Sequence, residues 1–276
     1  MKLVTWNTQW CCGLDGVVSA QRIVAGARAL ADFDVLCLQE VAQGYRALPG
    51  APGDQPAQLA ALLPGYQLFF GAAVDEFAAD GTRQRFGNLV ATRLPVAQVQ
   101  HHSLPWPADA GVPSMPRMCT VLTLQDPRLG ALRVMTTHLE YYSKRQRMAQ
   151  AQALCALHAQ ASALAAAPPA DGDAGSPFQA KTHTTQAILC GDFNLEASAP
   201  EYAAITAGGL HDAWRALHGA QPQPATFRLF DRSYGPEPVA CDFVFVSAGL
   251  LPRLRRMAID GQTRASDHQP VLVELG

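Results

Sequence analysis

The chain has 276 residues, a formal net charge of −2, and 49% hydrophobic and 16% charged residues. This balance excludes a disordered chain and indicates a globular protein with a substantial core. The slight acidic excess argues against a protein that holds long duplex DNA through its backbone, since such proteins are usually basic. No apolar run reaches the roughly 18 residues of a membrane span, and the N-terminus lacks the pattern of a secretion signal.

The first third of the chain predicts strands alternating with short helices. Residues 2–7 and 34–40 are apolar runs that end in polar groups, as expected for strands. Apolar residues recur at helical spacing over 19–32, with Ser19 as a candidate N-cap. A short helix is expected at 58–63, a strand pair at 66–74 and 87–93, and a polar hairpin loop at 75–86.

The rest of the chain continues this pattern. It predicts a strand pair at 119–126 and 131–140, followed by a long helix at 144–166. Segment 167–186 is rich in Pro, Gly, Ala and Asp and is predicted to be a flexible surface insertion. Strands are also expected at 187–191, 240–247, 254–259 and 270–275, and helices at 199–207 and 212–219. These elements favour two packed sheets with helices outside, an α/β sandwich that forms a single domain over 1–276.

The cysteine pattern bears on the cellular compartment. There are seven cysteines, an odd number, and no CxxC pair. Cys37, Cys119 and Cys190 lie in apolar strand-like runs, where a free thiol packs as a small hydrophobe. Cys11 and Cys12 are adjacent but have no second pair, so we interpret them as loop cysteines rather than metal ligands. The pattern favours a reducing cytoplasm.

Polar residues recur at the ends of predicted strands, where no packing need explains them. They are Asn7, Glu40, His138, Asp192 with Asn194, and Asp267 with His268, while Asp242 begins a further strand. Strands of a sandwich can bring their ends to one rim, so we expect these carboxylates, amides and imidazoles to converge.

Such a set suits hydrolysis of a phosphate ester with a divalent metal. A hard cation such as Mg²⁺ takes oxygen ligands and keeps several waters, and Glu40 is the best candidate for a direct ligand. Asp192 can orient or deprotonate the attacking water, and Asn194 can hold the nucleophile or a phosphate oxygen. Asp242 beside His268 would raise the pKa of the imidazole and make a cationic clamp for the transition state.

Each residue alone also has a structural interpretation. Asn7 could be a turn residue, Glu40 a helix cap and His138 a rim histidine. The stretch GDFN at 191–194 could be an Asx-turn, and Asp267 with His268 could cap a loop. The joint pattern is less expected by chance than any one member.

With these residues considered together, the chain resembles the endonuclease/exonuclease/phosphatase superfamily, which includes deoxyribonuclease I, abasic-site endonucleases, neutral sphingomyelinases and tyrosyl-DNA phosphodiesterase 2. The resemblance implies a four-layer sandwich of two mainly antiparallel sheets flanked by helices. The matching segments are TWN (5–7), LQEV (38–41), GNLVATRLPV (87–96), TTHLE (136–140), GDFN (191–194), DFVFVS (242–247) and SDHQPV (266–271).

The resemblance also implies roles for these positions. Glu40 binds Mg²⁺, with Mn²⁺ as a substitute, and Asn7 and Asp267 lie near the same ion. Asp192 activates the water, Asn194 contacts the phosphate or nucleophile, and His268 contacts the scissile phosphate while paired with Asp242. His138 contacts a phosphate oxygen or assists the leaving group; its carboxylate partner is not evident, and Glu76 is one guess. Asn88 and Arg117 are candidates for the pocket edge, or else a turn residue and a solvated charge.

These observations lead to a predicted function. We expect a metal-dependent phosphodiesterase acting on a phosphoester substrate, with a nuclease or DNA-end phosphodiesterase favoured by TTHLE. Two alternatives stay open: an enzyme for a small phosphoester or lipid head group, and a catalytically silent phosphate-binding module. No obligate protein partner is evident.

Overall fold

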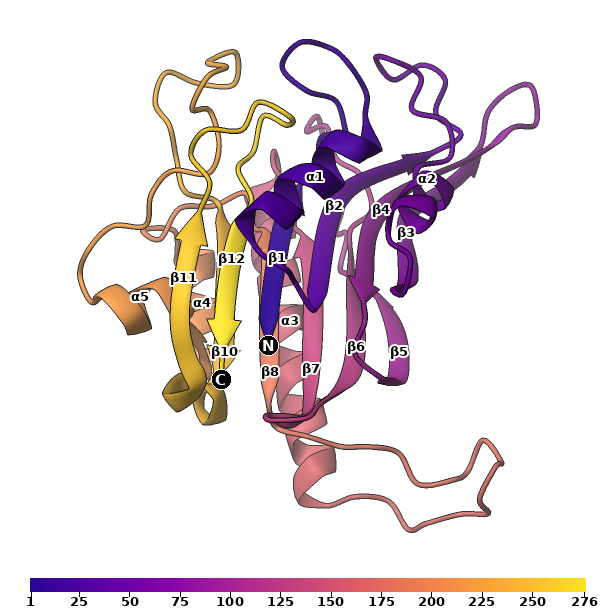
Figure 1. The fold of residues 1–276 in the computed structure, drawn as a ribbon, viewed down its shortest axis with the longest axis vertical. Coiled ribbons are helices and arrows are strands. Elements are labelled where there is room, and N and C mark those ends of the chain that lie inside the picture. The colour runs from indigo at the N-terminus through magenta and orange to yellow at the C-terminus, as the bar shows by residue number, and fades with distance from the viewer.

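The computed structural model describes residues 1–276 and contains two six-stranded sheets packed face to face (Figure 1). The first sheet has the order β11-β12-β1-β2-β4-β3 and the second β5-β6-β7-β8-β10-β9. The strands of the first sheet are β1 (Lys2–Asn7), β2 (Val35–Gln43), β3 (Gln67–Phe77), β4 (Arg83–Thr92), β11 (Leu254–Ile259) and β12 (Val271–Leu275). Those of the second sheet are β5 (Val96–Ser103), β6 (Met118–Asp126), β7 (Gly130–His138), β8 (Ala187–Asp192), β9 (Leu210–Asp212) and β10 (Asp242–Ser247).

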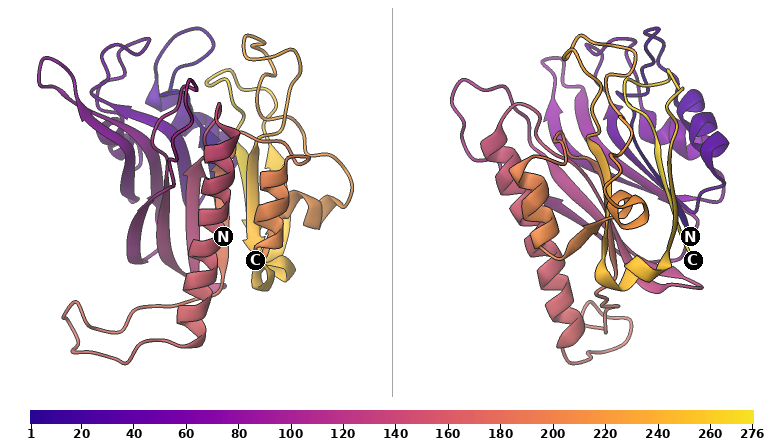
Figure 2. Two further views of the ribbon diagram at one scale, coloured as in Figure 1. Left: turned by 180° about the vertical axis from the view of Figure 1, so that it is seen from behind. Right: turned by 90° about the vertical axis from the view of Figure 1, so that its left-hand side faces the viewer.

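The helices are α1 (Ala20–Leu30), α2 (Gln55–Leu62), α3 (Lys144–Ala166), α4 (Pro200–Ala207) and α5 (Ala213–His218), with a 3₁₀ helix η1 (Ala248–Arg253). Helices α1 and α2 cover the outer face of the first sheet and α3 and α4 that of the second, whereas α5 and η1 add to the layer between the sheets (Figure 2). Ser19 caps α1 by accepting a hydrogen bond from the Arg22 amide, as the sequence predicts. None of the helices combines the length and apolar character that crossing a membrane requires.

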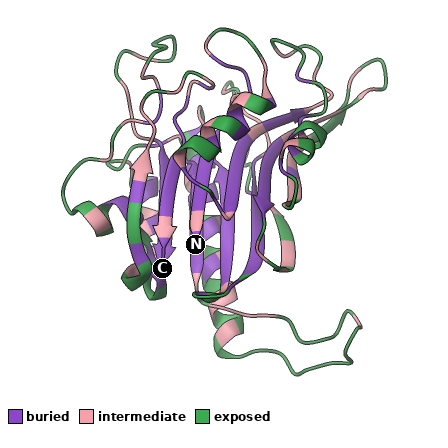
Figure 3. Ribbon diagram, in the orientation of Figure 1, coloured by how far each residue is buried: buried purple, intermediate pink, exposed green.

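Alternation along the strands builds three apolar layers. Leu3 packs between the sheets with residues such as Val134 and Val244, whereas its neighbour Val4 faces outward to the layer beneath α1 and α2. A third layer lies between the second sheet and helices α3 and α4, and includes Phe193. This is the period-two pattern of strands covered on both faces, and it confirms the expected sandwich. Figure 3 shows the strands buried along most of their length.

The parallel pairs lie near the middle of each sheet and fix where the polar strand ends fall. β1 pairs with β2 and β7 with β8 in parallel, and every other pairing is antiparallel. The C-terminal ends of β1, β7 and β8 carry Asn7, His138 and Asp192. His138 and Asp192 are partners in the β7–β8 register, so they lie at the same level of one rim.

Three differences from the sequence prediction concern element boundaries. The hairpin expected as a polar loop over 75–86 is mostly strand, because β3 and β4 pair as far as Phe77 with Arg83. β5 and the three-residue β9 were not predicted; β5 is an edge strand with much exposed surface and only polar residues in its last four positions, so it lacks a strong apolar pattern. β2 continues past its expected end at Glu40 as far as Gln43.

Segment 167–186 contains no helix or strand and is mostly exposed. In Figure 1 it extends from the lower end of α3, opposite the loops that follow β1 and precede β12. The insertion is therefore remote from the rim where the polar strand ends meet. Its flexibility stays a prediction.

Candidate active site

A pocket of about 240 Å³ opens at the rim between the two sheets. Six of the eight predicted site residues line it: Glu40, His138, Asp192, Asn194, Asp267 and His268. The other two, Asn7 and Asp242, are buried and hydrogen-bond to members of this group. The structure thus brings together all eight residues, which lie up to 261 positions apart in the chain.

Asn7 joins the two sheets at the floor of the pocket. Its Nδ2 donates to Asp192 Oδ2 at 2.9 Å and to Glu40 Oε1 at 3.1 Å. Its Oδ1 accepts the amide of Gln9 at 3.1 Å, which fixes the orientation of the carboxamide. Asn7 therefore bridges two carboxylates and reduces their repulsion.

Glu40 lies in a β-bulge rather than at a strand end, which corrects the expectation from sequence. Register with β4 shifts between Leu38 and Val41, so two residues of β2 oppose one residue of the partner. Glu40 has a φ of 58°, a left-handed conformation that is uncommon for a side chain of this kind. Such bulges re-aim side chains next to functional sites, and this one turns Glu40 into the pocket.

The last residues of β8 include a required glycine, and the turn that follows places Asp192 and Asn194. Gly191 has a φ of 137°, and a Cβ there would lie 1.9 Å from the Thr137 carbonyl oxygen. The Asn194 amide donates to Asp192 Oδ1 at 2.9 Å, closing an Asx-turn. The turn and the catalytic interpretation are thus compatible, because Asp192 Oδ2 remains directed at Asn7.

His138 is held as a neutral acceptor. Asn194 Nδ2 donates to the Leu139 carbonyl at 2.9 Å and lies 3.0 Å from His138 Nε2. Since the carbonyl requires an N–H from this amide nitrogen, Nε2 accepts the other hydrogen and the ring is protonated on Nδ1. Burial, with the nearby Arg117 charge, lowers the pKa of His138 to about 3, which agrees.

The carboxylate nearest His138 is Asp192, with Oδ2 3.4 Å from Nε2. The guess of Glu76 is wrong: its carboxylate accepts the Tyr45 hydroxyl at 2.9 Å on the β3 strand. The pairing of β7 with β8 explains Asp192, since it sets the two residues side by side.

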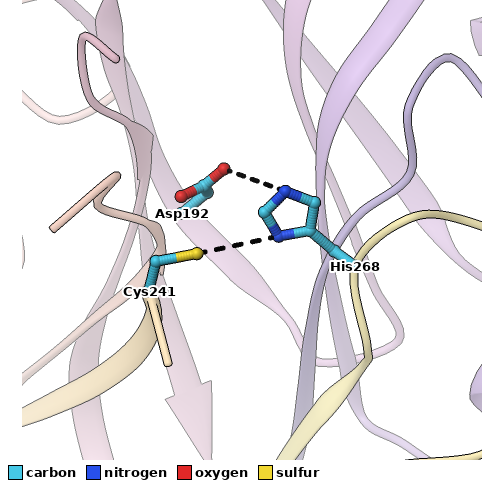
Figure 4. A group of neighbouring side chains, drawn as sticks. All are labelled: Asp192, Cys241 and His268. Atoms are coloured by element: carbon cyan, nitrogen blue, oxygen red, sulfur yellow. Dashed lines mark hydrogen bonds and ion pairs between the residues drawn. The ribbon is translucent and has the colours of Figure 1, made fainter. Parts of the chain in front are cut away.

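His268 lies between two buried carboxylates. Its Nδ1 is 2.9 Å from Asp242 Oδ2, and its Nε2 is 3.6 Å from Asp192 Oδ2. Figure 4 shows that the Nε2 side of the His268 ring faces the Asp192 carboxylate. Burial alone would lower the pKa of His268, but the Asp242 and Asp192 charges outweigh it and raise the pKa well above its ordinary value. The cationic imidazole in turn helps to hold the pKa of Asp192 below its usual range, against the effect of burial.

Contacts from three segments fix the His268 ring and backbone. Phe227 stacks on the imidazole with ring centroids 4.3 Å apart and 17° between planes. Trp6 Nε1 donates to the His268 carbonyl at 2.9 Å, and Ser266 Oγ accepts the His268 amide at 3.2 Å. Phe227 thus holds the plane of the ring of this catalytic candidate.

Cys241 is a neighbour that the sequence did not single out. Its Sγ donates to Asp242 Oδ2 at 3.6 Å. The same Sγ lies 4.0 Å from His268 Nδ1 (Figure 4). Asp192, Cys241 and His268 form a group with atoms close enough to hold a metal. Burial raises the pKa of Cys241 well above its ordinary value, however, and both imidazole nitrogens face carboxylates. A protonated thiol is a poor ligand, so this group suits a hydrogen-bonded histidine clamp better than a metal.

The oxygen donors beside it fit a hard cation. Burial and the neighbouring Asp267 charge raise the pKa of Glu40 to about 7. Burial also raises the pKa of Asp267, with Asp192 acting in the same direction. Carboxylates that are buried together in this way ionise readily only beside a compensating positive charge. Glu40 and Asp267 are thus suited to Mg²⁺, with Asn7 holding Glu40 in place.

The remaining candidates separate into two groups. Arg117 lines the pocket and donates through Nε to Glu140 Oε2 at 3.1 Å. Asn88 does not line it; its Nδ2 donates to the Met118 carbonyl at 3.2 Å and ties β4 to β6. A second cavity of about 410 Å³ adjoins the first and includes Lys144.

Comparisons with solved structures support the same fold. An endonuclease/exonuclease/phosphatase from Beutenbergia cavernae DSM 12333 is 25% identical, with a TM-score of 0.70, and the match covers 100% of this chain and 72% of that one. A mannosyl-6-phosphatase from Bacteroides thetaiotaomicron VPI-5482 is 19% identical, with a TM-score of 0.68 and coverages of 100% and 99%. D. rerio TDP2 complexed with a single-strand DNA product is 18% identical, with a TM-score of 0.66 and coverages of 100% and 98%.

No curated protein sequence matches this chain. The model of the Endonuclease/Exonuclease/phosphatase family matches residues 4–268, which include all eight site residues. Two packed six-stranded sheets with helices around them are consistent with that match. The chain therefore belongs to the endonuclease/exonuclease/phosphatase family.

Proposed function

We propose that this protein is a Mg²⁺-dependent phosphodiesterase that acts by direct attack of an activated water, and that its substrate is DNA, as for a nuclease or DNA-end phosphodiesterase. One observation carries the proposal: Asp192 contacts Asn7, His138 and His268 in a single pocket. An ionised carboxylate, a neutral imidazole and a cationic imidazole are the groups that water activation and phosphate charge stabilisation require.

Glu40 and Asp267 would hold Mg²⁺. When bound there, the ion neutralises charge on the phosphoryl oxygens and the leaving group. Mn²⁺ takes similar oxygen ligands and is proposed as a substitute. The two hydrogen bonds from Asn7 to Glu40 and Asp192 fix the positions of these carboxylates relative to each other.

The residues on the other side of the pocket orient the attacking water and bind the phosphate. Asp192 orients the attacking water and accepts its proton, while Asn194 fixes the position of His138. His138 meets a phosphoryl oxygen or the leaving group only if Asn194 Nδ2 releases the lone pair of its Nε2 when substrate binds. His268, kept cationic by Asp242, donates from Nε2 to a phosphoryl oxygen and stabilises the charge of the transition state.

The mouth of the pocket supports a substrate with ring-shaped groups. Tyr142 and Tyr234 are exposed, and Tyr141 lies edge-on to each, with centroids 4.8 and 6.4 Å away. Exposed aromatic faces stack on nucleic-acid bases with little sequence preference. The fold shared with TDP2, whose structure holds a single-strand DNA product, is in line with this choice.

A second candidate is a phosphoesterase for small phosphoesters. The pocket volume of about 240 Å³ and the net charge of −2 support a compact ligand, and a mannosyl-6-phosphatase shares the fold. A cytoplasmic location is part of both proposals, supported by the burial of Cys37, Cys119 and Cys190 as small hydrophobes in strands.

The test is turnover of bis-p-nitrophenyl phosphate and a substrate panel with and without Mg²⁺. The panel contains single-stranded DNA, 5′-tyrosyl DNA, abasic DNA and a hexose 6-phosphate. We expect metal-dependent hydrolysis of diesters with kcat/KM highest for a DNA substrate. Faster turnover of the hexose phosphate would favour the second candidate. No metal-dependent turnover of any substrate, with Asp192→Asn equal to wild type, would favour a silent phosphate-binding module.

A further inference from the structure

Two buried arginines near the pocket differ in how they use their hydrogen-bond donors. Arg147 donates through Nη1 to the carbonyls of Glu140 and Tyr141 and through Nε to Glu201, at 2.8 to 3.2 Å. Arg117 is equally buried, at 6% exposure, but its guanidinium donates only through Nε, to Glu140. The Nη donors of Arg117 therefore have no protein acceptor.

The free donors of Arg117 are costly to leave unused. Its Nη1 is sealed from water with no partner, whereas Nη2, also without a partner, is not sealed. A buried unpaired donor is unfavourable, and an arginine that forms an ion pair through Nε alone leaves its fork of Nη groups available. The structure thus keeps a cationic donor group without a partner in the wall of the pocket.

Glu140 holds this guanidinium in a fixed place. It is fully buried, and its Oε1 accepts the Tyr142 amide at 3.0 Å. Its Oε2 accepts both Arg117 Nε and the Met115 amide, and the Glu140 amide itself donates to Gln150 at 2.9 Å. A carboxylate anchored by backbone amides positions the arginine without neutralising its Nη donors.

The charge of the pocket explains what the free donors could bind. Arg117 is the one lysine or arginine among the lining residues, against the carboxylates of Glu40, Asp192 and Asp267. An anionic substrate needs cationic partners on more than one side in such a pocket. A guanidinium N–H donates a charge-assisted hydrogen bond to an oxygen of a phosphoryl group.

We propose that Arg117 is a substrate-contacting residue that binds a phosphoryl oxygen through Nη2, the donor that is not sealed, and that Glu140 is its positioning residue. This assignment rests on the proposed function for the identity of the ligand as a phosphoryl group. It adds a third cationic contact, beside His268 and the divalent ion, from the wall formed by the residues that precede β6.

The test compares three proteins with wild type: Arg117→Lys, the double variant Arg117→Met/Glu140→Gln, and Arg145→Met. The lysine variant keeps the charge and the pairing with Glu140 but loses the fork. The double variant leaves no unpaired charge in the core, which protects folding. Arg145 is exposed, donates to the Ala108 carbonyl and does not line the pocket, so it is the matched control.

Two measurements are needed: binding of inorganic phosphate by calorimetry, and hydrolysis of bis-p-nitrophenyl phosphate across a Mg²⁺ titration. We expect the double variant to bind phosphate about 10- to 100-fold more weakly and to lose about 100-fold in kcat/KM, with an unchanged Mg²⁺ half-saturation. Arg117→Lys should recover part of the affinity, and Arg145→Met should match wild type.

The outcomes separate this inference from the proposed function. Phosphate affinity within twofold of wild type in both Arg117 variants, or no phosphate binding by wild type, overturns the role of Arg117. A wild-type protein that binds phosphate through Arg117 but hydrolyses no phosphoester supports this inference while the proposed function fails. Active enzyme with unaffected Arg117 variants leaves the proposed function intact and removes Arg117 from the site.

Discussion

The two sheets contribute carboxylates of opposite character to one pocket. Glu40, on the sheet that contains β1 and β2, has a pKa raised to about 7 by burial and by the Asp267 charge. Asp192, on the sheet that contains β7 and β8, has a pKa that cationic His268 and the Asn7 amide lower, against the effect of burial. One carboxamide, Asn7, contacts both.

The difference indicates a division of labour between the sheets. The acids of the first half, Glu40 and Asp267, keep raised pKa values although the His268 charge acts on both, so that half is suited to bind a metal. The second sheet pairs its acids with imidazoles, so that half is suited to proton transfer and phosphate binding. His268 joins them, because it precedes β12 of the first sheet while its partner Asp242 begins β10 of the second.

The largest expected effect comes from removing the charge of Asp192. We expect Asp192→Asn to lower kcat for bis-p-nitrophenyl phosphate by about 10³- to 10⁴-fold, because the site loses its proton acceptor. The pKa of His268 should also fall, since one of its two carboxylate neighbours becomes neutral.

The same variant distinguishes the two halves of the pocket. The Mg²⁺ half-saturation should change far less than kcat if Asp192 serves the water rather than the metal. A large rise in the Mg²⁺ requirement with little loss at saturation would place Asp192 with the metal-binding half instead. Thermal unfolding checks that the variant is folded.

A smaller loss is expected from the histidine clamp. His268→Gln should reduce kcat by about 10²- to 10³-fold, as for loss of one donor to a developing charge. Asp242→Asn should act in the same direction by lowering the pKa of His268. His211→Gln, an exposed change on β9, is the control and should be silent. A loss under tenfold in both site variants would count against the clamp.

Much of this division could be predicted from the sequence, because strand ends carry polar residues in recognisable stretches. GDFN places a carboxylate and a carboxamide directly after Gly191, where the backbone lies too close to Thr137 for a residue with a Cβ. TTHLE and SDH place the imidazoles. These signals are local, so a sequence reveals them without any knowledge of pairing.

The sequence predictions that were wrong or missing concern features that depend on contacts between distant segments. The partner of His138 follows from the register of β7 with β8, and a sequence does not state that register. The sequence gives no sign of the bulge at Glu40, because the residues around it form an ordinary strand pattern. β5 was missed since an edge strand can carry many polar residues and still pair along one side.

Charge removal at Glu40 tests the metal-binding half. We expect Glu40→Gln to raise the Mg²⁺ concentration for half-maximal activity by about 10- to 100-fold. Mutation of residues that merely hydrogen-bond to metal ligands weakens metal binding by this much, so loss of a ligand should cost at least as much. Without Mg²⁺ its melting temperature should equal or exceed that of wild type, because burial disfavours the native charge. The rise in melting temperature that Mg²⁺ produces in wild type should be largely lost.

Glu76→Gln is the control for that experiment. Glu76 is exposed on β3 and contacts Tyr45, so its removal should leave both the Mg²⁺ titration and the thermal shift unchanged. Equal Mg²⁺ responses in wild type and Glu40→Gln would mean that the first sheet does not hold the ion.

The smallest expected effect concerns a polar link between the sheets. Gln39 Nε2 on β2 donates to Thr136 Oγ1 on β7 at 3.0 Å, and both residues are fully buried. We expect Gln39→Met to lower the free energy of unfolding by about 1 kcal/mol, the net worth of a neutral hydrogen bond. Removing the unpaired Gln39 Oε1 at the same time limits the loss.

A double-mutant cycle with Thr136→Val isolates the contact between the two sheets. A coupling of about 0.5 to 1.5 kcal/mol in chemical denaturation is expected if this hydrogen bond helps to hold the sheets in register. Because Gln39 precedes Glu40 in the bulge, the same cycle applied to Mg²⁺ half-saturation shows whether the link also places the metal-binding half against Asp192. Zero coupling in both measurements would mean that apolar packing alone aligns the sheets, and that the Asn7 bridge is a consequence of this alignment rather than a contributor to it.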